Sequence, residues 1–170
     1  LLLVFGLVIS LFSFTRPLPL VQIAKGTSGL IDILKAHQTE VLQELETCFL
    51  AKAERDEIAS LRKHGLSVSV LDRDSQGKEY FLIPFLSPAR LKAISGLGYL
   101  LPVEPNLYLF WTDRGDPLAL LPPDIQRKPL PRFSILPFLK TYPHTEGLTP
   151  GLQVNDVIES YVVEKVTAHL

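Results

Sequence analysis

Residues 54–70 have the sequence ERDEIASLRKHGLSVSV, which predicts a helix followed directly by a strand. Glu54, Asp56 and Glu57 lie in the first turn of the helix, basic residues occupy its last turn at 62–64, and Gly65 follows as the C-cap. From position 66 to 70, Leu and Val alternate with Ser, which is the period of a half-buried strand. A helix and a strand of this kind need further strands to cover their apolar residues.

The preceding residues supply those strands. Residues 21–24 form a short strand candidate, a helix begins near Leu30, and residues 41–51 predict two strands that meet at a turn near Glu46. The order over residues 21–71 is therefore β-α-β-β-α-β, the ferredoxin-like arrangement within an α+β fold class. The residues expected to form its core are Ile23, Leu34, Phe49, Ile58, Leu61 and Val68.

The same order of elements begins again near Glu79. Residues 80–83 predict a strand, Ser87 and Pro88 start a helix, and Pro105-Asn106 forms the turn of a second hairpin. After Asp113 the sequence allows at most a short helical turn. The prediction is a second, degenerate β-α-β-β unit, an internal duplication of order and spacing.

The two ends of the chain have different compositions. Residues 1–14 carry no charge and are mostly Leu, Val, Ile and Phe, which predicts a signal peptide or an uncleaved signal anchor. A proline-rich stretch follows the second unit, and its apolar residues are expected to lie against a surface. From Asn155 an apolar stripe at helical spacing continues towards Leu170. The chain also contains no Met, so a fragment of a longer protein is expected.

These features predict five segments. They are a signal peptide or anchor at 1–16, a ferredoxin-like unit at 17–74, the degenerate unit at 75–124, a Pro-rich connector at 125–153, and the first helix of a truncated further domain at 154–170.

The charge composition argues against nucleic acid as a partner. Seventeen basic residues stand against eighteen acidic ones, without long runs of either sign. Membrane contact is expected only through the N-terminal apolar segment, if that segment is not cleaved.

We find no complete catalytic, cofactor-binding or metal-binding motif in the sequence. No histidine among His37, His64, His144 and His169 has a second ligand at a metal-binding spacing. Cys48 lies in an apolar run and is expected to be a buried hydrophobe. Asp72-Arg73-Asp74 predicts a solvated turn, and residues 95–98 (SGLG) predict a helix stop. No catalytic, cofactor or metal residue is therefore assigned.

Residues 48–68 comprise a strand that ends a hairpin, followed by the helix and strand described above. They resemble the prosegment of secreted di-zinc aminopeptidases of the bacterial leucyl aminopeptidase kind. The helix predicted at 157–166 resembles the entry into the peptidase domain. This resemblance implies a non-catalytic prosegment of an exported metallopeptidase, which assists or restrains a downstream peptidase domain in cis. The zinc ligands would lie in that downstream domain, so no residue here inherits their role.

Two alternatives remain open. In the first, the chain is an exported or membrane-anchored protein-interaction module with no enzymatic partner in cis. In the second, it is the regulatory domain of an unrelated exported hydrolase.

Overall fold

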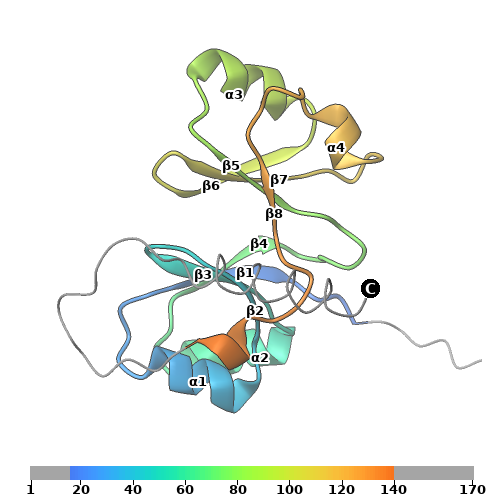
Figure 1. Ribbon diagram of the computed structural model, residues 1–170. Coiled ribbons are helices and arrows are strands. Elements are labelled where there is room, and N and C mark those ends of the chain that lie inside the picture. Colours follow the sequence, from blue (N-terminus) through green and yellow to red (C-terminus); the bar gives the residue numbers. More distant parts are fainter. Residues whose placement is uncertain (1–15, 140–170) are drawn as a thin grey trace, which may run out of the picture.

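The computed structural model describes residues 16–139, which form two four-stranded antiparallel sheets and a few short helices (Figure 1). The prediction of a mixed chain of helices and strands is confirmed. Residues 1–15 of the predicted signal segment and the whole predicted terminal helix at 154–170 lie outside the described residues. Among residues 16–139, no helix has both the length and the apolar character needed to span a bilayer.

The first unit contains six elements in the predicted order. They are β1 (Leu20–Ala24), α1 (Leu30–His37), β2 (Glu40–Glu44), β3 (Cys48–Lys52), α2 (Arg55–Lys63) and β4 (Val68–Asp72). The strands lie in the order β2-β3-β1-β4, and each neighbouring pair is antiparallel. Gly65 takes the left-handed conformation with φ 81°, as the residue after a helix end often does.

The second unit repeats this order of elements. They are β5 (Phe81–Pro84), α3 (Pro88–Ser95), β6 (Tyr99–Glu104), β7 (Leu107–Trp111), α4 (Pro117–Leu120) and β8 (Lys128–Pro129). The strand order is β6-β7-β5-β8, so each strand has the position of its counterpart in the first unit.

The second unit thus continues past residue 124, into the range where the sequence predicts a connector. Strand β8 pairs with β5 through Lys128–Leu82 and Pro129–Phe81. It is the edge strand of its sheet, and an edge is the place where proline, which lacks a backbone N–H, is tolerated in a sheet.

Both units also carry an irregularity in their second strand. The register shifts between Val41 and Gln43 in β2, and between Pro102 and Glu104 in β6, so each strand has one extra residue. The extra residues, Leu42 and Val103, are both buried between the two sheets.

The two sheets pack face to face, and the helices cover their outer faces (Figure 1). Residues from both sheets make the central cluster, which we call the sheet interface: Leu20, Leu42, Leu45, Cys48, Leu50, Tyr80, Leu82, Val103, Leu109, Trp111 and Leu130. A second cluster lies between the first sheet and α1 and α2, and a third contains Ile83, Ile94 and Phe110 of the second unit. The result is four layers in the order helices, sheet, sheet, helices.

The six residues predicted to form the core of the first unit are all buried in one cluster. The alternation of Val and Ser in β4 predicts that Val68 and Val70 both face the core. Val68 is buried, but Val70 is 43% exposed. Strand β4 lies at the edge of its sheet, so no further strand covers its outer side. A strand pattern from sequence does not distinguish an edge from a centre.

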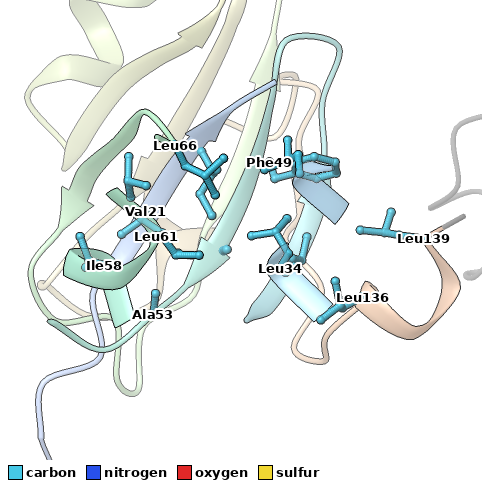
Figure 2. Packing of buried hydrophobic residues seen from close by; sticks show 14 of the residues in the cluster. Val21, Leu34, Phe49, Ala53, Ile58, Leu61, Leu66, Leu136 and Leu139 are labelled. Carbon is cyan, nitrogen blue, oxygen red and sulfur yellow. The ribbon is translucent and has the colours of Figure 1, made fainter. Parts of the chain in front are cut away.

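The apolar residues of the predicted connector lie against the first unit of the same chain. A 3₁₀ turn, η1 (Leu136–Phe138), returns to the first unit, and the backbone N–H of Ile135 donates to the carbonyl of Val41 at 2.7 Å. Figure 2 shows Leu136 and Leu139 beside Leu34 and Phe49.

Two residues of this segment remain largely accessible: Phe133 is 44% and Phe138 47% exposed. The expectation that the segment lies against a surface is confirmed for Ile135, Leu136 and Leu139, and the surface is the core of the first unit.

This packing predicts unequal effects for two substitutions in one segment. Ile135→Ala removes a fully buried side chain and should lower the free energy of unfolding by about 2–5 kcal/mol, as large-to-small changes in a core do. Phe138→Ala alters a half-exposed ring and should cost clearly less. Urea denaturation followed by circular dichroism measures both, and equal effects would contradict the docking of this segment.

Gly98 is required by a close approach rather than by its backbone angles. A Cβ atom at this position would lie 2.4 Å from the carbonyl oxygen of Trp111 and 3.0 Å from the Phe110 ring. Gly96, two residues earlier at the C-cap of α3, has open space around it.

We therefore expect Gly98→Ala to destabilise the protein, because the β6–β7 pairing must shift to admit the methyl group. Gly96→Ala should be tolerated, because it meets no atom and lowers the entropy of the unfolded chain. Thermal unfolding of the two variants side by side tests this difference.

Candidate functional site

Cys48 lies in the sheet interface and is buried, as predicted. The side-chain amide of Gln22 donates to its sulfur at 3.3 Å and to the carbonyl of Val103 at 3.0 Å. Burial raises the pKa of the Cys48 thiol above its usual value, so the thiolate needed for a nucleophile is disfavoured. Gln22 therefore acts as a polar link between the two sheets.

A group of charged and polar side chains lies at the rim of the sheet interface. We call it the rim cluster, and it consists of Asp72, Lys78, Tyr80 and Asp113. The Lys78 ammonium lies 2.8 Å from Asp72 and 3.0 Å from Asp113, and the Tyr80 hydroxyl donates to Asp72 at 2.8 Å. Asp72 ends β4 of the first unit, whereas Tyr80 and Asp113 flank β5 and β7 of the second. The rim cluster thus joins the two units.

The sequence predicts a solvated turn at Asp72, but only 10% of this side chain is exposed. Burial raises the pKa of the Asp72 carboxyl, but hydrogen bonds from Lys78, from the Asp74 backbone and from Tyr80 outweigh burial, and the net pKa lies below the usual value. Burial lowers the pKa of Lys78, and its bonds to Asp72 and Asp113 reverse this effect, so the pKa rises.

The Tyr80 hydroxyl is also held in its protonated form. Burial is the largest cause that raises its pKa, and the adjacent Asp72 carboxylate adds to it. At neutral pH the cluster therefore holds a carboxylate at Asp72, an ammonium at Lys78 and a neutral hydroxyl at Tyr80. The Lys78 ammonium and the Tyr80 hydroxyl both have carboxylate acceptors, which stabilises one fixed arrangement.

The lowered pKa of Asp72 predicts how its contribution to stability depends on pH. The ionised carboxylate stabilises the fold at pH values above its ordinary pKa, near 3.8, and this stabilisation is lost as the pH falls through the lower native value. Asp72→Asn should cost about 1.5–3 kcal/mol at pH 7, the worth of hydrogen bonds to a charged group. The difference from the unsubstituted protein should shrink below about pH 4.

Urea denaturation midpoints measured from pH 3 to pH 7 follow this difference. Glu46→Gln, in the exposed turn between β2 and β3, is the matched control and should show little effect across this range. A cost of Asp72→Asn that does not change with pH would contradict the assignment.

A groove of about 470 Å³ opens next to the rim cluster. It lies between residues of β2 and β3 in the first sheet and residues of β5 and β8 in the second. Its apolar lining comes from Leu42, Tyr80, Phe81, Leu118, Pro129, Leu130 and Pro131. This volume is within the usual range for ligand-binding sites.

The charged lining of the groove is mostly basic: Lys52, Lys78, Arg127 and Arg132 stand against a single acid, Glu79. Arg132 pairs with Glu79, and Lys52 lies 3.7 Å from Glu40. Arg127 donates to the carbonyl of Pro122 at 3.2 Å, and within residues 16–139 it forms no ion pair. We call this feature the basic groove. The sequence gives no local sign of it, because its lining comes from segments up to 90 residues apart.

Two histidines that are far apart in sequence meet in the structure. The rings of His37, the last residue of α1, and His64, at the C-cap of α2, have their centroids 5.2 Å apart. His144 and His169 lie outside the described residues. In the described part of the chain, no group of three or more His, Cys, Asp or Glu residues is placed to hold a metal ion.

Comparison with known proteins finds no family model, no curated protein and no solved structure that matches this chain.

Proposed function

We propose that this chain is a non-catalytic binding module, built from two ferredoxin-like units, that holds an extended acidic peptide segment in the basic groove. The shared strand order of the two sheets, with two helices in each unit, supports the ferredoxin-like description of both units. The groove lies where the two units meet, a common position for binding sites.

The observation that carries the proposal is the lining of the groove. An apolar floor favours a ligand with apolar side chains, and the Arg127 guanidinium, which has no ion pair within residues 16–139, favours one with a carboxylate. An extended peptide presents side chains to alternate sides, so a segment that alternates apolar and acidic residues meets both requirements. Arg127, which has no acidic partner in the described residues, is the group best placed to gain one from a ligand.

The rim cluster supports binding rather than proton transfer. Lys78 lies between the carboxylates of Asp72 and Asp113, and Tyr80 donates its hydroxyl proton to Asp72, so these contacts fix the wall of the groove. A rigid wall lowers the entropy cost of binding an extended ligand.

The test uses a fluorescein-labelled probe peptide of alternating Glu and Val, six residues long. Its binding to the full chain is followed by fluorescence anisotropy, with a Lys/Val peptide of equal length as the charge-reversed control. We expect the acidic probe to bind and the basic one not to bind. The affinity should fall with added salt, because exposed ion pairs are screened.

The double variant Arg127→Gln, Arg132→Gln should weaken binding about three- to tenfold, because it removes two solvent-exposed ion pairs of modest strength. Arg55→Gln is the matched control. This arginine lies on α2, in the helical layer on the outer face of the first sheet, so its substitution should leave binding unchanged. Equal binding of the acidic and basic probes, or an equal loss with Arg55→Gln, would sink the proposal.

The prosegment interpretation stays a prediction. It requires export through residues 1–16 and a downstream zinc peptidase domain that supplies the acidic segment in cis. The docking of Ile135, Leu136 and Leu139 on the first unit weakens one argument for it, because these residues are not left for a second domain to cover. If the downstream domain is the partner, the chain added in trans should change that domain's refolding yield, and the arginine double variant should reduce the change.

A further inference from the structure

The pair formed by His37 and His64 is independent of the basic groove and lies in the outer helical layer. The two rings stand at an interplanar angle of 72°. His64 is exposed and His37 is half-buried, so solvent reaches the pair. Two imidazoles in contact at an accessible surface offer ring nitrogens, which are common ligands of transition metals.

A hydrogen bond defines the tautomer of His64. Its Nδ1 atom lies 2.9 Å from the carbonyl oxygen of Ser60. A carbonyl oxygen only accepts, so in this bond Nδ1 carries the proton and donates it. In the neutral imidazole the lone pair is then on Nε2. Histidines that bind metals commonly show this arrangement, with one ring nitrogen donating to a backbone carbonyl and the other facing the metal.

We propose that His37 and His64 form a binding site for a divalent first-row transition metal, with Zn²⁺ as the reference ion. Two imidazoles that share a tetrahedral Zn²⁺ at Zn–N distances of about 2.0–2.1 Å have ring centroids roughly 5 Å apart. The observed centroid separation of 5.2 Å is close to this value. The remaining coordination positions are open to water or to a small ligand.

The surroundings select the kind of ion. Ca²⁺ and Mg²⁺ need several oxygen ligands, and the described residues place no carboxylate with the pair to form a group of three ligands. The last turns of the two helices carry the basic residues Lys35 and Lys63. A metal at this position must gain its affinity from bonds to neutral imidazole, which Zn²⁺, Ni²⁺ and Cu²⁺ form well.

The sequence predicts no metal ligand at either position because the two histidines belong to different helices. In the structure the two histidines become neighbours, because α1 and α2 lie on the same face of the first sheet (Figure 1).

Isothermal titration of the full chain with Zn²⁺ tests the site. We expect one ion per chain, and His37→Ala and His64→Ala should each lower the affinity by at least about tenfold. Loss of a residue that only hydrogen-bonds to a metal ligand lowers metal affinity roughly 10–100-fold, and each of these variants loses one of the two protein ligands themselves. Zn²⁺ should also raise the melting temperature of the unsubstituted protein and not that of the variants.

The double variant His144→Ala, His169→Ala is the matched control and should bind Zn²⁺ with unchanged affinity. His64 is exposed, so His64→Ala tests the site even if His37→Ala fails to fold, and the melting temperature without metal shows whether each variant is folded. Unchanged affinity in His64→Ala, loss of binding in the control, or absence of binding in the unsubstituted chain would overturn the proposal.

Discussion

The structure depends on one constraint: a sheet with helices on only one face must bury its other face elsewhere. Each unit places its helices on the outer side of its sheet, and the inner face consists of apolar residues such as Leu50 and Leu109. Neither inner face is compatible with water, because burial of apolar surface is the dominant favourable term in folding. The two sheets therefore cover each other, and the rim cluster and the groove exist only because they do.

Polar groups at the junction give this apolar contact a defined orientation. Gln22 reaches across to the backbone of Val103, and the Glu104 carboxylate accepts hydrogen bonds from the backbone and hydroxyl of Thr47 at the far turn. Apolar faces alone would allow the sheets to slide or rotate, since the hydrophobic effect has no direction. Hydrogen bonds at separate points of the junction favour one alignment and so hold the two walls of the groove in place.

The sequence predicts the first unit well because α2 has strong end signals and the apolar residues follow clear periods. It also contains a sign of the sheet interface, since Cys48, Phe49, Leu50 and Ala51 are apolar without alternation, as in a strand buried on both faces. Elements as short as β8 leave no periodic pattern. The groove and the histidine pair depend on residues brought together by the fold, which a single sequence does not reveal.

The docking of Ile135 on β2 has a consequence for the order of events during synthesis. During translation the first unit leaves the ribosome before residue 135 has been added to the chain. Part of the core of this unit is therefore uncovered when it emerges. Its last packing step waits until the whole second unit has been translated. The two units are therefore expected to complete folding as one cooperative event, although domains in a chain often fold one after another. A chain interrupted before residue 135 would leave apolar surface for chaperones or proteases to recognise.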